Sequence, residues 1–230
     1  MDILEIKNVA YSYVNSKEKV LSGVNQKFEL GKFYAIVGKS GAGKSTLVKI
    51  ITGVYSMDSG KIIMDNQEIS IHSPKDSEKA GISIIHQDQQ LVPFFDVTRN
   101  AFLGSEIRGK GGKLDFRRMK ALVDEKLKLI DSDFTSDRQI STLSVGQREQ
   151  VAIVTALLQN PKILILDEPT ASLSTREIEK LFEVIGRLKK EGVTIIYISH
   201  HLDEIFRITD TITVLRAVSY THLRAHETKA

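Results

Sequence analysis

One short loop near the N-terminus constrains the fold of this 230-residue chain more than any other feature. It follows the apolar run 33–37, precedes the helical pattern at 47–51, and reads Gly38-Lys39-Ser40-Gly41-Ala42-Gly43-Lys44-Ser45. Its glycines allow successive backbone N–H groups to point toward one centre, and the helix that follows adds the positive end of its dipole. The spacing G-x-x-x-x-G-K-[ST] between a strand and a helix is typical of a phosphate-binding loop, whereas the alternative is an ordinary Gly-rich turn.

Two side chains of this loop have chemistry that suits a bound nucleotide. Lys44 offers a mobile positive charge to the terminal phosphates, and Ser45 offers a hydroxyl to Mg²⁺. A nucleotide phosphate and Mg²⁺ are therefore the expected ligands, and the family resemblance given below implies that the nucleotide is ATP. The expected binding residues are the loop and the residue after it: Gly38, Lys39, Ser40, Gly41, Ala42, Gly43, Lys44, Ser45 and Thr46.

A second feature is an apolar strand that ends in two carboxylates. Residues 163–166 are all aliphatic, and Asp167 and Glu168 follow them directly. A buried strand of a parallel sheet delivers such residues to the edge where ligands bind, and adjacent side chains leave in opposite directions. We expect Asp167 to face the metal and Glu168 to face an attacking water as general base. A solvated helix start capped by Asp167 is the alternative.

The alternation of apolar strands with helical patterns predicts the fold class. Strands are expected at 3–6, 20–30, 32–37, 61–65, 82–86, 162–166 and 193–198. Helical patterns occupy 47–51, 118–130 and 178–188, the last closed by Gly192. Buried strands alternating with helices favour a mainly parallel α/β sheet. The stretch 87–150 interrupts this alternation and is expected to be a helical subdomain inserted into the core.

Composition excludes several classes of protein. The chain contains no Cys, which excludes a disulfide scaffold, a thiol nucleophile and a Cys-based metal site. Its net charge of +3 is too small to favour nucleic acid as a partner. No apolar stretch approaches the roughly 20 residues that span a membrane, and residues 1–5 do not resemble a signal peptide. A cytoplasmic location is therefore expected.

The last residues differ from the rest of the chain. Residues 217–230 show neither a helical stripe nor strand alternation, and they resemble the read-through translation of a sequencing adapter. We therefore expect a native domain at 1–216, truncated at its C-terminus, followed by a non-native tail at 217–230. A genuine polar tail is the alternative.

Three further motifs, together with the two above, resemble those of ABC ATPases, a branch of the P-loop NTPases. Leu143-Ser144-Val145-Gly146-Gln147 resembles the LSGGQ-type signature, Gln87 the Q-loop residue and His200 the switch histidine. Tyr13 stands where this family places an aromatic residue against adenine. The resemblance covers 3–216 in the family order. It implies a P-loop NTPase core, with a mainly parallel sheet, an antiparallel β subdomain and an inserted helical subdomain.

The resemblance also implies residue roles. Ser144, Gly146 and Gln147 would close over ATP held by a second ATPase domain. Gln87 would reach Mg²⁺ or the attacking water, and His200 would orient that water with Glu168. Each residue alone has an ordinary alternative: Ser144 as a helix N-cap, Gln87 as a turn residue and His200 as a structural histidine. For the adenine contact, the neighbouring Tyr11 has the same chemistry as Tyr13.

Several stretches resemble the N-terminal ATPase domain of bacterial monosaccharide importers of the ribose, xylose and galactose class. They are 81–87, 100–104 and 197–206. This similarity implies a second ATPase domain (in the same full-length chain or as a homodimer), an integral membrane permease and, indirectly, a sugar-binding protein. It also implies a peripheral location on the inner face of the membrane. Ser174 replaces the aspartate that is common at this position in the family, and sugar importers often carry a small hydroxyl residue there.

Other functions remain open at this point. Another ABC importer or exporter class, or a ribosome-acting ABC protein, would carry the same motifs. The segment between Gln87 and Leu143 is too short for the long coiled coils of DNA-repair members. The basic run 108–120 is expected to be a solvated face, with contact to a membrane subunit or to acidic lipid headgroups as the alternative.

Overall fold

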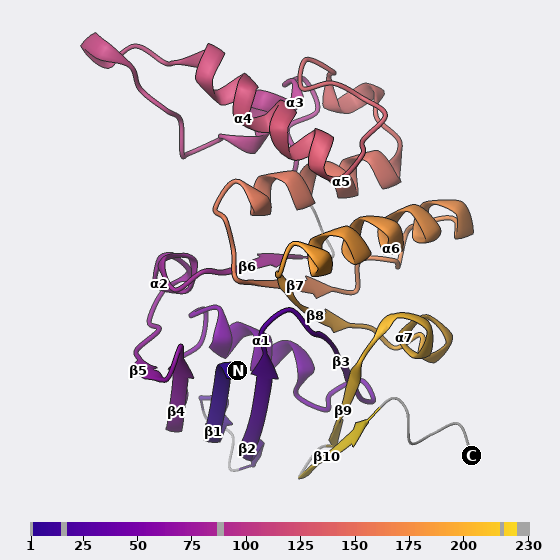
Figure 1. Cartoon of the computed structure of the whole chain (residues 1–230). Helices are drawn as coiled ribbons and strands as arrows, with labels where there is room; N and C mark the ends of the chain where they lie inside the picture. Colours follow the sequence, from indigo (N-terminus) through magenta and orange to yellow (C-terminus); the bar gives the residue numbers. More distant parts are fainter. Residues whose placement is uncertain (1, 15–17, 87–89, 217–218, 225–230) are drawn as a thin grey trace. The chain divides into compact units, whose positions relative to one another are not determined.

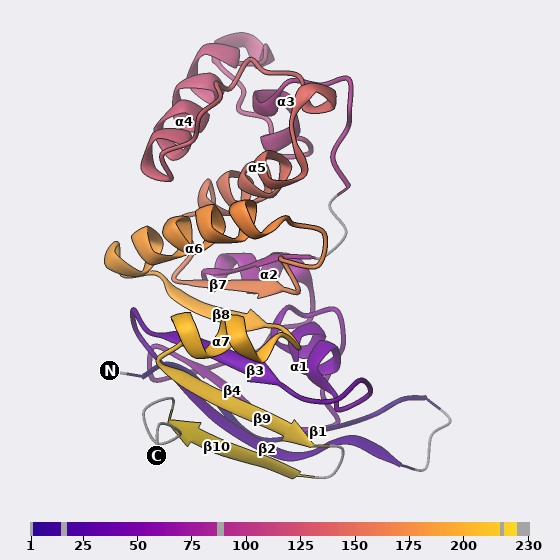
Figure 2. The same cartoon turned by 90° about the vertical axis from the view of Figure 1, so that its right-hand side faces the viewer.

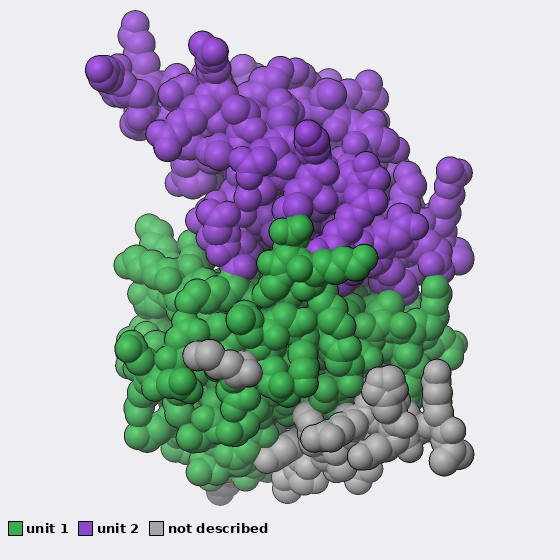
Figure 3. Space-filling model, in the orientation of Figure 1, with its two compact units in different colours: residues 1–84, 162–168, 189–230 green, residues 85–161, 169–188 purple. Residues whose placement is uncertain are grey.

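The computed structural model describes residues 2–14, 18–86, 90–216 and 219–224, with only the backbone described from Arg216 onward. These residues group into two compact units (Figure 3). Unit 1 comprises 1–84, 162–168 and 189–230, and unit 2 comprises 85–161 and 169–188.

The N-terminal part of unit 1 forms an antiparallel sheet in the order β2-β1-β4-β5. Its strands are β1 (Asp2–Ser12), β2 (Lys19–Glu29), β4 (Ser59–Met64) and β5 (Gln67–Ile69). Asp65 and Asn66 connect β4 to β5 with positive φ angles of 50° and 64°. Asp and Asn tolerate this conformation better than other non-glycine residues, so they permit a tight hairpin. The sheet is the antiparallel β subdomain that was expected.

The second sheet carries the elements around the phosphate loop. Its order is β10-β9-β3-β8-β7-β6. The strands are β3 (Phe33–Val37), β6 (Ile82–Ile85), β7 (Ile163–Asp167), β8 (Thr194–Ile198), β9 (Thr211–Arg216) and β10 (Ser219–Arg224). Strand β3 pairs in parallel with β8 and β9, and β7 pairs in parallel with β8. Every residue of β3 and β8 is buried, as the continuous apolar runs predict for a parallel sheet.

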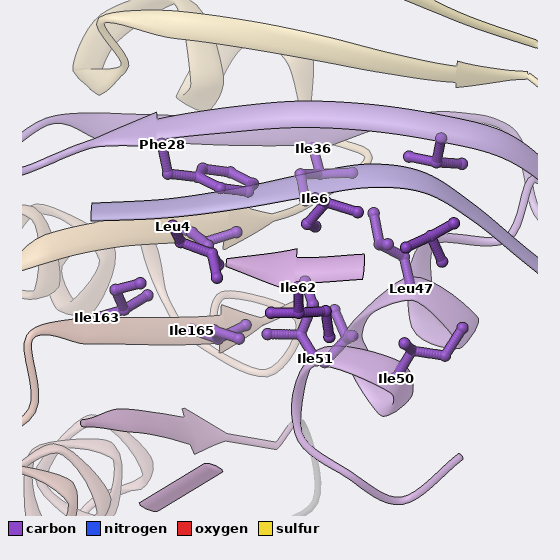
Figure 4. Packing of buried hydrophobic residues seen from close by; sticks show 14 of the residues in the cluster. Leu4, Ile6, Phe28, Ile36, Leu47, Ile50, Ile51, Ile62, Ile163 and Ile165 are labelled. Atoms are coloured by element: carbon purple, nitrogen blue, oxygen red, sulfur yellow. The ribbon is translucent and has the colours of Figure 1, made fainter. Parts of the chain in front are cut away.

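The helices of unit 1 are α1 (Lys44–Ile51), α2 (Pro74–Lys79) and α7 (Leu202–Ile208) (Figures 1 and 2). Helix α1 buries Leu47, Ile50 and Ile51 in one apolar cluster with residues of both sheets (Figure 4). Leu4 and Ile165 are completely buried in the same cluster. Burying side chains of this size stabilises the fold by roughly 2 kcal/mol each. This burial anchors the helix whose first turn closes the phosphate loop.

Unit 2 is mainly helical. It contains α3 (Val97–Ala101), α4 (Phe116–Leu129), α5 (Val145–Leu157) and most of α6 (Thr175–Lys190). Two short 3₁₀ turns lie at Lys110–Gly112 and Ile140–Thr142. Met119, Val123 and Leu127 are buried, so the stripe of α4 expected from its spacing is confirmed. None of the helices among the described residues is both long enough and apolar enough to pass through a membrane.

The C-terminal segment, which was left out of the fold prediction as a non-native tail, contains a strand. In the structure β10 pairs antiparallel with β9 from Ser219↔Arg216 to Arg224↔Thr211, and the assignment of 217–230 as non-native stays a prediction. A strand at the edge of a sheet gains backbone hydrogen bonds that do not depend on side-chain alternation, so this pairing left no pattern in the sequence. The short elements α2, β5 and α7 were also not predicted, because each is too short to show a clear period.

Two glycine substitutions are expected to act in opposite directions. Gly53, after α1, has a φ of 74°, and an added Cβ would lie 2.5 Å from the carbonyl oxygen of Ser73. Gly53→Ala should therefore lower the free energy of unfolding by about 3 kcal/mol. Gly186 lies inside α6 with open space at its Cβ position, so Gly186→Ala should raise the free energy of unfolding by about 1 kcal/mol. Urea unfolding measures both, and equal stability of the two variants would contradict this account.

Candidate functional site

The phosphate loop of unit 1 leaves β3 at Val37 and enters α1 at Lys44. Gly43 is the N-cap of α1, with a φ of 92°, and no side chain caps the helix. A Cβ at Gly43 would lie 2.6 Å from Cδ2 of Leu21, so both the conformation and the packing require glycine here. The first N–H groups of α1 are thus left for an anion, as the sequence pattern predicts for a phosphate loop.

Lys44 and Ser45, the two residues that follow Gly43, lie at the phosphate loop. The Nζ of Lys44 donates to the carbonyl oxygens of Gly38, at 2.7 Å, and Lys39, at 3.3 Å. The lysine charge is therefore held over the loop, between carbonyl partners that a phosphate could replace. Ser45 is exposed and Thr46 is buried.

A group of three tyrosines lies next to the start of α1. The hydroxyl of Tyr13 lies 3.0 Å from Oγ1 of Thr46. Tyr11 and Tyr55 stack with ring centroids 5.3 Å apart, and the Tyr13 ring meets both edge-on. Tyr13 is 44% exposed, whereas Tyr11 packs against the core cluster. The geometry favours Tyr13 over Tyr11 as the ring available to adenine, and the assignment stays a prediction.

The acidic end of β7 brings two predicted residues together. Glu168 adopts a φ of 51°, and its N–H donates to the carbonyl oxygen of Ile198 at 2.8 Å. This positive φ is uncommon for a residue with a Cβ and turns the chain sharply after the strand. Oε1 of Glu168 then lies 3.3 Å from Nδ1 of His200. A carboxylate that is held by an imidazole can accept the proton of a water molecule bound beside the pair.

The expected metal donors fit a magnesium ion. Among the described residues, no cluster of three or more His, Asp or Glu side chains could hold a metal ion by itself. Asp167 and Ser45 together would supply one carboxylate and one hydroxyl. Such a sparse set of oxygen donors suits Mg²⁺, which keeps several waters and takes other ligands from substrate phosphates. Gln87, the third expected ligand, lies outside the described residues.

The signature segment lies in unit 2, at the start of α5. Ser144 is the N-cap, and its Oγ accepts a hydrogen bond from the N–H of Gln147 at 3.2 Å. Oε1 of Gln147 accepts from the N–H of Ser144 at 3.0 Å, which completes a capping box. The Gln147 amide also donates to Asp133 at 2.9 Å. The Gln147 side chain therefore stabilises the helix start in this structure.

The sequence analysis missed Glu177, which binds this same helix start. Its Oε1 accepts from Oγ of Ser144, at 3.1 Å, and from the N–H of Gly146, at 2.8 Å. Its Oε2 accepts from Oγ of Ser174, at 2.8 Å, and from the N–H of Ser174, at 3.0 Å. These hydrogen bonds lower the pKa of the Glu177 carboxyl to about 2, and the bond from the Ser174 hydroxyl contributes most. The S-x-x-E spacing from Ser174 to Glu177 is a capping-box signal that could have identified it.

A second carboxyl group near the signature is shifted in the opposite direction. Glu149, on α5, is 8% exposed, and burial raises its pKa to about 7. It lines a pocket of about 420 Å³ in unit 2 together with Ser144, Gly146, Ser174 and Glu177. The carboxyl groups of Glu149 and Glu177, which both line this pocket, therefore titrate far apart.

The raised pKa of Glu149 predicts a pH-dependent stability. The unfolded chain ionises Glu149 near pH 4.5, whereas the folded chain keeps it protonated up to about pH 7. The folded state thus binds the extra proton in this window, and stability falls as pH rises from about 4.5 to 7. Glu149→Gln should remove that loss, which amounts to about 3 kcal/mol at most. Urea unfolding of both proteins at pH 5 and 8 measures it, and a stability difference that does not change with pH would contradict it.

Comparison with known proteins identifies the relatives of this chain. A family model described as ABC transporter matches residues 21–171. The chain is 43% identical over 213 residues to the ribose import ATP-binding protein RbsA of Bacillus subtilis (strain 168). That match covers 93% of this chain but 43% of the relative, so the chain spans less than half the length of that protein.

Solved structures share the fold. An ATP-binding cassette of an ABC transporter in its ADP conformation superposes with a TM-score of 0.87 and 27% identity, covering 99% of this chain and 92% of the other. A dimeric cassette in a post-hydrolysis state, bound to ADP and Pi, gives a TM-score of 0.76 and 25% identity, covering 97% and 99%. The expected fold, a P-loop core with a parallel and an antiparallel sheet, is confirmed.

Proposed function

The chain belongs to the ABC transporter family, and from this premise we propose that it binds and hydrolyses ATP to energise import of a monosaccharide through a membrane permease. The observation that carries the ATPase assignment is the geometry of unit 1. Unit 1 contains the start of α1, which no side chain caps and which follows a Gly-rich loop. It also contains the contact between Glu168 and His200. The 43% identity to a ribose import ATP-binding protein supports the sugar class.

Binding of the triphosphate would use the loop and the first turn of α1. Backbone N–H groups from Gly41 to Thr46 would surround the phosphate oxygens. Lys44 would exchange its carbonyl partners for the β- and γ-phosphates, and Tyr13 would pack against the adenine ring. Ser45 and Asp167 would hold Mg²⁺, which neutralises phosphate charge when bound.

Hydrolysis would depend on the pair at the end of β7. Glu168 would accept the hydrogen bond of the attacking water, and His200 would fix the position of the Glu168 carboxylate and contact the γ-phosphate. The contact of 3.3 Å between Oε1 and Nδ1 supports this pairing. Gln87 is proposed to reach the same water or Mg²⁺ from outside the described residues.

The remaining part of the site would come from a second ATPase domain. Ser144, Gly146 and Gln147 are proposed to meet the γ-phosphate of ATP bound to that domain, which lies in the same full-length chain or in a second copy. The solved dimeric cassette with ADP and Pi supports such a partner. A permease and a sugar-binding protein complete the proposed assembly, which places the chain at the cytoplasmic face of a membrane.

Turnover of ATP at several protein concentrations tests the proposal. Since this chain carries one such domain, a second copy would have to complete each site, and turnover should rise more steeply than linearly with concentration. Glu168→Gln should reduce it by about 10²- to 10⁴-fold, since the water loses its base. The exposed Glu183 on α6 provides the control variant Glu183→Gln, which should match the wild type. Strictly linear turnover would reject completion of the site by a second copy of this chain, and full activity of Glu168→Gln would reject Glu168 as the base.

A further inference from the structure

We propose that the carboxylate of Glu177 is an internal competitor for the anion site at the start of α5, and that a phosphate must displace it in order to bind there. This inference rests on the proposed function, in which Ser144 and Gly146 bind a nucleotide phosphate. It adds a regulatory contact that occupies the Ser144 hydroxyl and the Gly146 N–H until Glu177 leaves.

Ser144 and Gly146 each have a single proton to donate at the start of α5. The Ser144 hydroxyl has one proton, and it is donated to Oε1 of Glu177 at 3.1 Å. Gly146 has one N–H, and it is donated to the same oxygen at 2.8 Å. Both donors are therefore used by one carboxylate oxygen, which carries the same negative charge as a phosphate oxygen. Glu177 and a phosphate cannot occupy them at the same time.

The packing around Gly146 makes room for this carboxylate. A Cβ at position 146 would lie 2.7 Å from Cγ and 2.8 Å from Oε1 of Glu177. These distances are too short for two carbon or oxygen atoms that are not bonded to each other, so only glycine permits the contact as it stands. The absence of a side chain at Gly146 thus allows its N–H to bind either the Glu177 carboxylate or the proposed phosphate.

Ser174 connects the competitor to a second segment. Its hydroxyl and its N–H both donate to Oε2 of Glu177. An aspartate at this position, the common residue in the family, would place a second negative charge beside Oε2 and repel it. The Ser174 hydroxyl therefore stabilises the Glu177 carboxylate, which an aspartate would repel. Movement of the segment around Ser174 would change the strength of the hydrogen bonds between Glu177 and the start of α5.

The surroundings leave space for the exchange. The pocket of about 420 Å³ is lined by Ser144, Gly146, Ser174 and Glu177. Arg176 and Lys180, which are positively charged, also line it. A displaced Glu177 side chain can move within this pocket while the two cations retain positive charge near an incoming phosphate.

Inorganic phosphate is the probe that tests the competition, with the backbone amide of Gly146 followed by NMR in the full chain. Glu177→Ala removes both acceptors, and phosphate should bind at Gly146 at least about tenfold more tightly than in the wild type. Glu177→Gln keeps one neutral acceptor in place of two charged oxygens, so its affinity should be intermediate. Glu183→Ala on the same helix removes an exposed charge and should behave as the wild type.

Two outcomes would overturn the inference. Equal phosphate affinity in wild type and both Glu177 variants would mean that the carboxylate does not compete. No phosphate response at Gly146 in any protein would mean that this helix start is not an anion site. If the Ala variant does not fold, the comparison between Glu177→Gln and the wild type decides the question alone.

A second measurement separates this inference from the proposed function. In a Glu168→Gln background, the ATP concentration that gives half-maximal association of two chains is measured by sedimentation. Glu177→Gln should lower that concentration while ATP binding to the single chain stays unchanged. Association without ATP dependence would reject the proposed dimer, whereas the phosphate titration would still decide the role of Glu177.

Discussion

The burial of β3 and α1 on both sides of the phosphate loop is the constraint on which the candidate site depends. Every residue of β3 is buried, and Leu47, Ile50 and Ile51 fix α1 in the apolar cluster of unit 1. The chain between them must turn sharply, and Gly43 provides the positive φ that this turn requires. Because both ends are fixed by packing, the N–H groups of the loop are oriented before any ligand arrives, and little entropy is lost when one binds.

Hydrogen bonding within the chain is a common feature of the groups assigned to phosphate. Lys44 donates to loop carbonyls, the Thr46 hydroxyl contacts Tyr13, and Ser144 and Gly146 donate to Glu177. Polar groups in partly buried positions need such partners, because leaving them unpaired costs about 1–3 kcal/mol each. Phosphate binding therefore exchanges one set of hydrogen bonds for another. The net affinity for phosphate depends on the difference in free energy between the two sets of hydrogen bonds. Tyr13, which contacts Thr46, and Glu177, which binds Ser144 and Gly146, therefore influence phosphate binding without contacting the phosphate.

The sequence was sufficient to predict those parts of the fold and the site that depend on residues close together in the chain. The loop between β3 and α1, the acidic end of β7 and the stripe of α4 each follow from residues close together in the chain. Contacts between distant residues were not predictable in this way. The bond from Tyr13 to Thr46 and the bonds from Glu177 to the start of α5 depend on how strands and helices meet, which periodicity does not specify. Strand β10 depends on backbone pairing with β9 and was missed for the same reason.

The central claim is that the loop before α1 binds the phosphates of a nucleotide. Calorimetric titration of the folded chain with ATP and magnesium tests it most directly, with Lys44→Ala as the comparison. We expect the wild type to bind one ATP per chain, and Lys44→Ala to bind ATP at least about tenfold more weakly because the lysine charge is removed. A folded wild-type chain that binds no ATP, or a Lys44→Ala variant that binds it equally well, would contradict the claim.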